Sequence, residues 1–508
     1  MSDGAQRTER VHIQMQRVQT WLFAVPRLRA MVGANALLGE ALRISLPRLA
    51  RDGAGWTLAG STEQYPGIDA NDPLSEHDDP STDAEEGILA RDGGHFEAQF
   101  SAGAAAFAEA AGSLLRSRLP GLRYSISIDR KPFENDGQVH LSNELPVLAP
   151  CEWTGGALAS TVVIQGPDGH TVSLEVARRH AAAKDAEAGT ALDLASLLAA
   201  KTRLAGLNRA QELQDLVGDG YLALVHADGN GVGGRAPEGD AARARFFHRN
   251  RVLLRRALEV SINAHCGDEG QAPLVPLMLG GDDLLLVCRA EIALPLVVTL
   301  CEALASFQTD DAQDFELTLG VGVVIAKRAI PIYRLHEVAE QLASSAKRRF
   351  RGLVDGGAKG CSVIDWAVYS ASWVDDPAEV RARDWVCGVD VDHRILSQRP
   401  VDVLGDGLGT LRGLQRAARQ IAHAPRSQLR YLVEQLPRGR VLAELAFAEL
   451  SKEARGALGR AGVDGAWRRT RSDGPWITEL LDLVEIFEIE RLGRSGEHGR
   501  GKRETAHG

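Results

Sequence analysis

The sequence predicts an α+β protein with two ferredoxin-like (β-α-β-β-α-β) domains, a helical insert and a helical C-terminal domain. Short apolar strands and amphipathic helices alternate in that order within residues 216–375. A similar but less regular series occupies residues 1–150. In addition, 508 residues are too many for one ordinary core, so two to four domains are expected.

Five regions are expected along the chain: a first domain at 1–150, a linker or helical insert at 151–215, a second domain at 216–375, a helical domain at 376–492 and a disordered tail at 493–508. The first region contains the strand-like pieces RVHIQM, HFEAQF and LRYSISI and the small-residue helix SAGAAAFAEAAGSLLRSRL. An acidic, turn-rich insertion that includes SEHDDPSTDAEEG interrupts it and is typical of a solvated loop.

Composition excludes several classes of protein. A net charge of −10 means that the surface as a whole should not attract nucleic acid or anionic lipid. The six cysteines never form C-x-x-C, which argues against a zinc ribbon and favours buried reduced thiols. The N-terminus is too polar for a signal peptide, and the longest aliphatic run, ALPLVVTLCEALASF, is interrupted by Glu302 and judged too short to span a bilayer. We therefore expect a cytoplasmic protein with no membrane partner.

The second domain can be followed element by element. A strand is predicted at Tyr221 to Ala227, and a helix over 240–265 follows it with apolar residues on one face. Two strands, LVPLML and LLLVC, are joined at Gly280-Gly281, which indicates a hairpin. A helix at about 291–307, the strand FELTLGVGVVIA and a helix opening at Pro331 complete the series. Short loops and right-handed crossovers make this an antiparallel sheet with helices on one face.

Three aspartates are the strongest indication of function. Asp228 emerges at the carboxyl end of the first strand, and the hairpin brings Asp282 and Asp283 to the same end of the sheet. Because side chains alternate along a strand, only one of the adjacent pair can share a face with Asp228 unless the turn is distorted. Clustered carboxylates repel one another unless a cation lies between them, and Mg²⁺ favours a few carboxylates plus phosphate oxygens. The letters GGDD alone would equally suit an ordinary hairpin turn, but Asp228 at a matched strand end favours a metal site.

Two cations follow the aspartates on the last helix of the domain. Lys347 and Arg351 are four residues apart and are expected to share one exposed side. They could hold a triphosphate, or they could simply compensate the helix dipole, and both interpretations stay open. Lys359 is a weaker candidate of the same kind.

Two other motifs are set aside. Gly229, Gly231 and Gly234 match G-x-G-x-x-G, but a polar loop precedes the helix and no acidic residue follows about twenty positions later, as the dinucleotide fingerprint requires. These glycines more naturally let a loop wrap a nucleotide. His77-Asp78 lies in the acidic loop rather than on a helix, so an HD-type phosphohydrolase dyad is rejected.

The stretches YLALVHADGNGVGG, PLMLGGDDLLLVC and FELTLGVGVVIAKRAIPIYRLHEVAEQLASSAKRRFRG together resemble the second palm domain of the large subunit of type III CRISPR effector complexes. That GGDD palm is related to the GGDEF-type diguanylate cyclases and to the class III nucleotidyl cyclases. RVQTWLFAVPRLRAMVGANALLGEAL is similar to the opening of the family's first palm, and RDGGHFEAQF to its hairpin. There His95 and Phe96 follow Gly93-Gly94, so this first copy would lack the metal site. The C-terminal helices are similar to the family's last domain.

The resemblance implies that ATP, or another NTP, is converted to a cyclic nucleotide or cyclic oligoadenylate at a two-metal Mg²⁺ or Mn²⁺ site. By carry-over, Asp228, Asp282 and Asp283 hold the metals, and Lys347 and secondarily Arg351 contact the triphosphate. The carry-over also gives the pocket-shaping residues, which are Gly229, Asn230, Gly280 and Gly281. The implied partners are guide or target RNA, other CRISPR complex subunits, a downstream cyclic-nucleotide effector and a second copy of the chain.

The sequence also departs from the family. It shows no HD nuclease domain at its start and no paired cysteines, and 508 residues are few for a full effector subunit, which favours a stand-alone or reduced enzyme in antiviral signalling. Two alternatives remain. One is a non-catalytic scaffold that binds RNA or proteins through Arg-rich C-terminal helices, and the other is a diguanylate cyclase.

Overall fold

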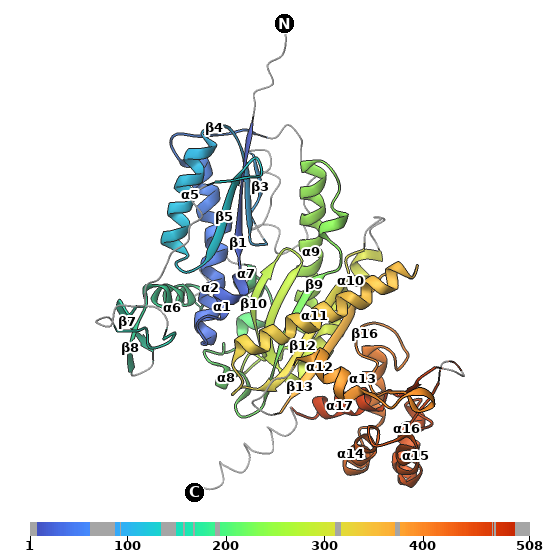
Figure 1. The fold of residues 1–508 in the computed structure, drawn as a ribbon. Helices are drawn as coiled ribbons and strands as arrows, with labels where there is room; N and C mark the ends of the chain where they lie inside the picture. The colour runs from blue at the N-terminus through green and yellow to red at the C-terminus, as the bar shows by residue number, and fades with distance from the viewer. Residues whose placement is uncertain are drawn as a thin grey trace. The chain divides into compact units, whose positions relative to one another are not determined.

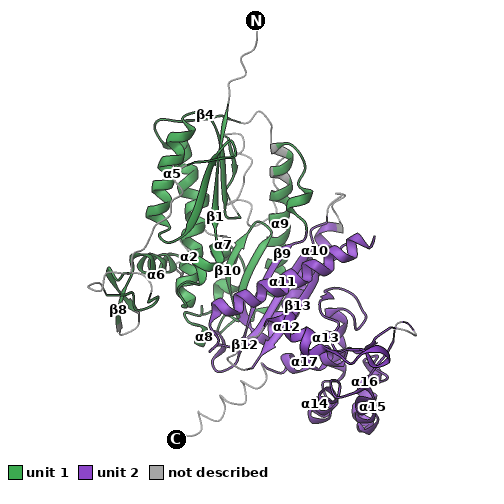
Figure 2. Ribbon diagram, in the orientation of Figure 1, with its two compact units in different colours: residues 1–215, 231–286 green, residues 216–230, 287–508 purple. Residues whose placement is uncertain are grey.

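The computed structural model describes residues 8–60, 87–91, 93–133, 149–155, 158–165, 168–187, 194–309, 316–370, 376–469, 471 and 474–492. The chain forms two compact units, which Figure 2 colours separately. Unit 1 comprises residues 1–215 and 231–286, and unit 2 comprises residues 216–230 and 287–508. The acidic loop with His77 and Asp78 and the predicted tail at 493–508 lie outside the described residues.

Unit 1 opens with the first ferredoxin-like domain, whose main strands and helices are labelled in Figure 1. Its strands are β1 (Glu9–Gln16), β2 (Thr57–Leu58), β3 (Ile88–Ala90), β4 (His95–Ala102), β5 (Arg123–Ile128) and β6 (Lys131–Pro132). Its helices are α1 (Val18–Phe23), α2 (Leu28–Glu40), a π-helical turn (Ala41–Ser45), α3 (Leu46–Asp52) and α5 (Ala104–Arg118). Strand β1 pairs antiparallel with β4 and β5, and β3 pairs with β4, which is the ferredoxin-like order. The predicted α+β class and the strands expected in this domain are confirmed.

The core of this domain follows from alternation along the strands. Val11 and Ile13 of β1 and Phe96 and Phe100 of β4 are fully buried, because every second residue faces the helices. Phe107 of α5 packs onto this face, with its ring centroid 4.6 Å from that of Phe100. Buried aromatic residues of this size supply much of the apolar area that holds a sheet to its helix.

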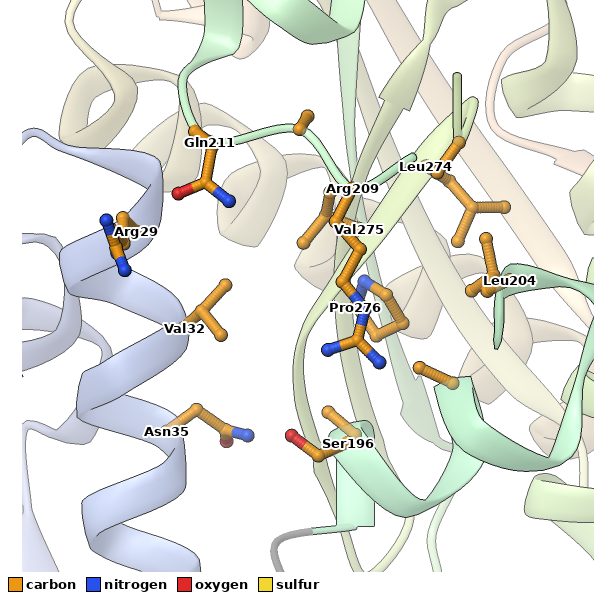
Figure 3. A pocket seen from close by; sticks show the side chains of 14 residues that line it. Arg29, Val32, Asn35, Ser196, Leu204, Arg209, Gln211, Leu274, Val275 and Pro276 are labelled. Atoms are coloured by element: carbon orange, nitrogen blue, oxygen red, sulfur yellow. The ribbon is translucent and has the colours of Figure 1, made fainter. Parts of the chain in front are cut away.

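The rest of unit 1 differs in part from the helical insert that was expected. It contains the two-stranded antiparallel sheet β7 (Thr161–Gln165) and β8 (Asp168–Val172), besides α6 (Leu174–Glu187), α7 (Leu194–Lys201) and a 3-10 turn (Arg203–Gly206). Helix α8 (Leu213–Val217) begins in unit 1 and ends in unit 2. Helix α9 (Asp240–His265) has the predicted bounds. A cavity of about 60 Å³ has Val32 and Asn35 of α2 on one side and Ser196 of α7 and Leu274 on the other (Figure 3). No predicted site residue lines this cavity.

Unit 2 contains the strands β9 (Tyr221–Gly229), β12 (Leu319–Lys327), β13 (Val363–Tyr369) and β16 (Val401–Asp402). Strand β12 pairs antiparallel with β9 and parallel with β13, and β13 pairs antiparallel with β16. Helix α11 (Ile332–Asp355) packs on β9, β12 and β13. Along the chain, β9, α9, β10 (Leu274–Gly280), β11 (Asp283–Arg289), α10 (Ala290–Thr309) and β12 follow the predicted β-α-β-β-α-β order.

Helix α10 corrects one expectation from the sequence. The aliphatic run was judged too short to span a bilayer, but Ala290–Gln308 is long and apolar enough to do so by length and composition. Half of this stretch is buried within the protein, and α10 packs against β9, β12, α13 (Leu411–Gln420) and α17 (Leu480–Glu490). Its apolar character is therefore explained by packing inside unit 2.

Helix α11 lies unusually close to β12, and this closeness can be tested. One face of α11, which includes Ile332, Leu342 and Ala346, is buried. A Cβ built on Gly322 of β12 would lie 2.1 Å from the carbonyl oxygen of Ala339, so only glycine permits the approach.

We expect Gly322→Ala to lower the free energy of unfolding by about 1–3 kcal/mol, measured in urea. The control is Gly352→Ala in α11, where a Cβ meets nothing within 4 Å. The control variant should be neutral or stabilising by about 0.5–1 kcal/mol. Equal changes in the free energy of unfolding for the two variants would contradict the close approach of α11 to β12 at Gly322.

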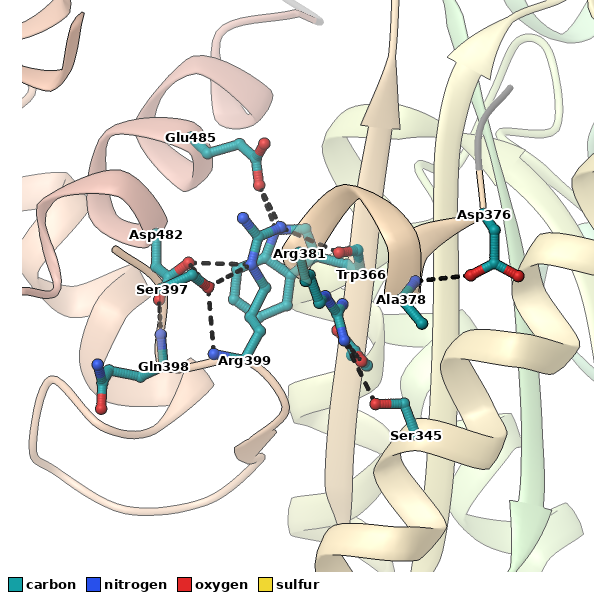
Figure 4. A network of polar contacts seen from close by, with 11 residues as sticks. Ser345, Trp366, Asp376, Ala378, Arg381, Ser397, Gln398, Arg399, Asp482 and Glu485 are labelled. Atoms are coloured by element: carbon teal, nitrogen blue, oxygen red, sulfur yellow. Dashed lines mark hydrogen bonds and ion pairs between the residues drawn. The ribbon is translucent and has the colours of Figure 1, made fainter. Parts of the chain in front are cut away.

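The C-terminal part of unit 2 is mainly helical, with α12 (Pro377–Val380), α13, α14 (Arg426–Gln435), α15 (Arg440–Glu449), α16 (Lys452–Arg460) and α17. A small sheet, β14 (Val386–Cys387), β15 (Arg394–Ile395) and β17 (Trp476–Ile477), accompanies the helices. A buried polar network joins α17 and the loop before β16 to β13 of the main sheet (Figure 4). The guanidinium of Arg399 pairs with Asp482 at 2.9 Å and Glu485 at 2.6 Å and donates to the carbonyl of Trp366 at 2.9 Å.

Candidate nucleotide and metal site

Asp228 lies near the end of β9, opposite Gly320 of β12. The ammonium group of Lys347, on α11, donates to Oδ2 of Asp228. A Cβ built on Gly320 would lie 2.6 Å from Cγ of Lys347, so the missing side chain is what lets the lysine cross β12 to the carboxylate. Lys347 was expected on an exposed helix side. It is instead half-buried against the sheet, because Gly320 leaves a channel that the sequence does not reveal.

Asn230 lies directly after β9 and is fully buried. Its backbone N–H donates to the carbonyl of Thr318 at 2.8 Å, and its Nδ2 donates to Oγ1 of the same residue at 3.1 Å. Its Oδ1 has no hydrogen-bond partner among the described residues, and a Cβ on Gly320 would lie 3.0 Å from it. A buried acceptor without a donor is costly. This oxygen is therefore suited to a cation or to a donor on a ligand.

The GGDD turn is shifted by one residue from the prediction. Gly280 ends β10 and Asp283 begins β11, so the two turn residues are Gly281 and Asp282. Gly281 has φ +58°, a left-handed conformation that favours glycine. This places Asp282 in the turn and Asp283 on the strand, both half-buried.

The two hairpin turns of unit 1 adjoin each other. A Cβ on Gly280 would lie 3.5 Å from Cα of Gly93, which belongs to the β3–β4 turn. Counted from the strands, Gly93-Gly94 corresponds to Gly281-Asp282, and His95 corresponds to Asp283. The first domain therefore places a turn with glycine and histidine, at the positions that match Asp282 and Asp283, beside the GGDD turn.

Two cavities border these turns within unit 1. The smaller, about 260 Å³, is lined by Asp282 and Asp283 together with Gly280, Met15, Arg17, Asn35, Arg43, Gly93 and Gly94. The larger, about 830 Å³, is lined among others by five arginines and three carboxylates: Arg10, Arg91, Arg130, Arg243, Arg251, Glu97, Asp129 and Asp282. Two stacked imidazoles, His12 and His95, also line it, with 3.2 Å between their facing nitrogens. Burial and then His12 lower the pKa of His95. The excess of arginine favours anionic ligands.

The predicted site residues fall into two groups. Asp228, Asn230 and Lys347 come together in unit 2, whereas Gly280, Gly281 and the two adjacent aspartates belong to unit 1. Gly229 is the last residue of β9, and Arg351 is exposed on α11. Lys359 is exposed and pairs with Glu316 at 2.9 Å. A loop with a short 3-10 turn (Gly233–Arg235) separates Asn230 from α9, which agrees with rejecting the dinucleotide fingerprint.

One cluster in unit 2 was missed by the sequence reasoning. His226 of β9 and His336 and Glu340 of α11 converge, on the two elements that also carry Asp228 and Lys347. The two imidazoles stack with ring centroids 5.8 Å apart. Burial, and then the neighbouring His226, lower the pKa of His336 to about 3. The i, i+4 spacing of His336 and Glu340 was the only signal in the sequence, and it pointed to no strand partner.

A ferredoxin-like fold with a GGDD hairpin and an aspartate at the end of the first strand defines a palm-type domain. Residues 221–352 match the family model described as Cas10/Cmr2, second palm domain. The resemblance to the large subunit of type III CRISPR effector complexes is thereby confirmed for this stretch. A comparison with curated proteins found no match.

Similar solved structures are Csm1–Csm4 cassettes. One in complex with cA4 has a TM-score of 0.49 and 13% identity, covering 96% of this chain and 71% of that one. Another with pppApApA has a TM-score of 0.48 and 14% identity, covering 96% and 70%. A third, with pppApA, has a TM-score of 0.39 and 12% identity, covering 68% and 53%. The chain thus spans about half of the third protein.

Proposed function

We propose that the protein is a metal-dependent nucleotidyltransferase that converts ATP to a cyclic nucleotide or cyclic oligoadenylate and releases pyrophosphate. The observation that carries the proposal is a second palm domain at 221–352 that retains all three aspartates, with Lys347 bonded to Asp228. We further propose that the enzyme acts in the cytoplasm in CRISPR-type antiviral signalling. Its partners would then be RNA, complex subunits or a second copy, and a downstream cyclic-nucleotide effector.

The donor atoms fit a hard divalent cation. Asp228, Asp282 and Asp283 offer carboxylate oxygens, and Asn230 offers a buried amide oxygen that lacks a donor among the described residues. Oxygen ligands of this kind suit Mg²⁺ or Mn²⁺ and not softer ions. When bound, such ions would offset charge on the attacking and leaving oxygens. The three aspartates would hold them.

The remaining roles belong to the chain itself. A ribose hydroxyl oxygen would bond to the α-phosphorus, the bond from that phosphorus to pyrophosphate would break, and the hydroxyl proton would pass to solvent. Lys347 would leave Asp228 and contact the triphosphate, since its ammonium group is a donor suited to phosphate oxygens. Gly229, Gly280 and Gly281 would leave room for the nucleotide beside the backbone.

The test is incubation of the purified protein with each NTP and Mg²⁺ or Mn²⁺. Pyrophosphate release would be measured, and the products would be identified by mass spectrometry. We expect turnover of ATP and a cyclic product. No turnover of any NTP, even with RNA supplied, would overturn the proposal and favour the scaffold. Strict dependence on GTP would indicate a diguanylate cyclase instead.

The scaffold alternative is weakened by the arginines that motivated it. Arg412 and Arg416 of α13 pair with Asp406, and Arg426 and Arg430 of α14 share Glu488. Arginines engaged with carboxylates in this way are less available for RNA phosphates. No observation independently favours the diguanylate cyclase.

Lys347 can be tested separately from the aspartates. We expect Lys347→Met to raise the KM for ATP by roughly tenfold or more, because a charge-assisted contact with phosphate contributes about 1.5–3 kcal/mol. Arg351→Met should have a smaller effect, since Arg351 is exposed. The control is Arg348→Met on the exposed side of α11. Equal KM values for the Lys347 and Arg348 variants would remove Lys347 from the nucleotide site.

A further inference from the structure

We propose that His226, His336 and Glu340 form a binding site for a transition-metal ion of the Zn²⁺ class, separate from the aspartates. The three residues belong to unit 2, on β9 and α11. Nothing in the nucleotidyltransferase proposal requires this site, and the two proposals stand or fall independently.

The geometry brings three ligand atoms together. One nitrogen of each imidazole and one oxygen of Glu340 all lie within 4.8 Å of one another. Nε2 of His336 and Oε1 of Glu340 are 3.9 Å apart. Tetrahedral zinc has ligand distances of about 2.0–2.2 Å, which puts its ligand atoms roughly 3.4 Å from each other. Small side-chain rotations would therefore close the cluster around an ion.

The local fold explains why these residues meet. His336 and Glu340 are one helical turn apart, so they lie on the same face of α11. His226 faces them from β9, opposite Gly322 of β12. Because Gly322 has no side chain and lets α11 approach closely, the helix brings its two ligands down to His226. In the same way, the missing side chain of Gly320 lets Lys347 reach Asp228.

The ligand set selects the class of ion. Two imidazoles and one carboxylate suit Zn²⁺ and neighbouring transition metals, whereas Mg²⁺ prefers oxygen ligands alone. Three protein ligands leave a fourth position for water. Both histidines are buried, while the side chain of Glu340 is 45% exposed and gives an ion a way in from solvent.

The position of the cluster suggests what the ion would do. His226 is two residues before Asp228 and shares its face of β9. Glu340 is seven residues before Lys347, so both lie on one side of α11. An ion held here would tie α11 to β9 beside the Asp228–Lys347 pair. It would therefore fix the position of the lysine without contacting a nucleotide.

The experiment uses the full-length, tag-free protein stripped with EDTA and then supplied with excess Mg²⁺. Zn²⁺ is titrated by calorimetry, and Co²⁺ is titrated while its visible spectrum is recorded. We expect one tightly bound Zn²⁺ per chain, Co²⁺ bands of a low-coordinate nitrogen and oxygen site, and a rise in Tm. In Glu340→Gln and His336→Gln the Kd should weaken at least about tenfold.

Two variants serve as controls. Glu337→Gln lies on the exposed side of the same helix and should bind Zn²⁺ like the wild type. Asp282→Asn should also keep the ion, which separates this proposal from the nucleotidyltransferase. Equal Kd values for Zn²⁺ in the Glu340 and Glu337 variants would overturn the proposal. Failure of the wild type to bind Zn²⁺ in the presence of excess Mg²⁺ would overturn it as well. Loss of the ion in His95→Gln but not in Glu340→Gln would place it at the His12–His95 pair and would equally overturn it. Because the Co²⁺ spectrum is recorded on the wild type, it tests the proposal even if a variant fails to fold.

Discussion

Replacing Asp282 and Asp283 together by asparagine is expected to abolish pyrophosphate release from ATP. The two carboxylates line a cavity of about 260 Å³ beside the glycine turn of the first domain, and they supply two of the three proposed metal ligands. Asparagine keeps the shape of each side chain but removes its charge. We expect kcat/KM to fall at least about a hundredfold, which corresponds to about 2.7 kcal/mol of lost transition-state stabilisation. Pyrophosphate release under initial-rate conditions measures the effect.

The matched control is Asp268→Asn, which removes a highly exposed carboxylate of the same unit. It should leave both turnover and Tm unchanged. Turnover that survives in the double variant would remove both aspartates from the proposed site. A large fall in Tm of the double variant would instead attribute the loss to misfolding. Replacing each aspartate alone then shows how much of the fall in kcat/KM is due to the turn residue, Asp282, and how much to the strand residue, Asp283.

Arg399→Met is expected to lower the free energy of unfolding of unit 2 by about 3–5 kcal/mol. The guanidinium is fully enclosed, and it lies between the carboxylates of Asp482 and Glu485 and over the ring of Trp366. Burial raises the pKa of Asp482, with Arg399 opposing that shift. Methionine would fill much of the volume but would leave the buried carboxylate of Asp482 and the partly buried carboxylate of Glu485 without their cation. Urea-induced unfolding followed by tryptophan fluorescence measures the loss.

A surface ion pair that involves α17, the helix that carries Asp482 and Glu485, provides the comparison. Arg426 pairs with Glu488 of α17, yet about half of the arginine side chain is exposed. Arg426→Met should cost less than about 1 kcal/mol, because solvent screens such pairs. If the two substitutions cost the same, the network does not stabilise the junction between β13, α17 and the loop before β16. The stability cost of Asp482→Asn should lie between those of Arg399→Met and Arg426→Met, since the amide oxygen can still accept a hydrogen bond from Ser397.

Much of the fold could be predicted because local patterns determine it. The strand-like pattern of HFEAQF predicted β4, the periodicity of residues 240–265 predicted α9, and Gly280-Gly281 predicted the β10–β11 hairpin, whereas the β3–β4 hairpin was implied by the family resemblance alone. The three aspartates were predicted from their places at strand ends. The turn itself was misplaced by one residue, because the sequence alone does not specify which residue of the turn takes the positive φ found at Gly281.

What could not be predicted depends on packing between distant segments. Lys347 was expected on an exposed side, and only the close approach over Gly320 shows why it reaches Asp228. The cluster of His226 with His336 joins residues more than a hundred positions apart. The β7–β8 hairpin had a signal, since TVVIQ is rich in β-branched residues and GPDG favours a turn, but helical sequence nearby obscured it.

The division of the chain into units has a practical consequence for deletion experiments. The polypeptide passes from one unit to the other after residues 215, 230 and 286, so neither unit is a continuous segment. A fragment such as 216–375 would carry pieces of both units and the whole of neither. Truncation would remove packing partners together with the segment of interest, so a dead fragment could not assign an activity to any domain. Single substitutions in the intact chain are therefore the appropriate way to dissect this protein.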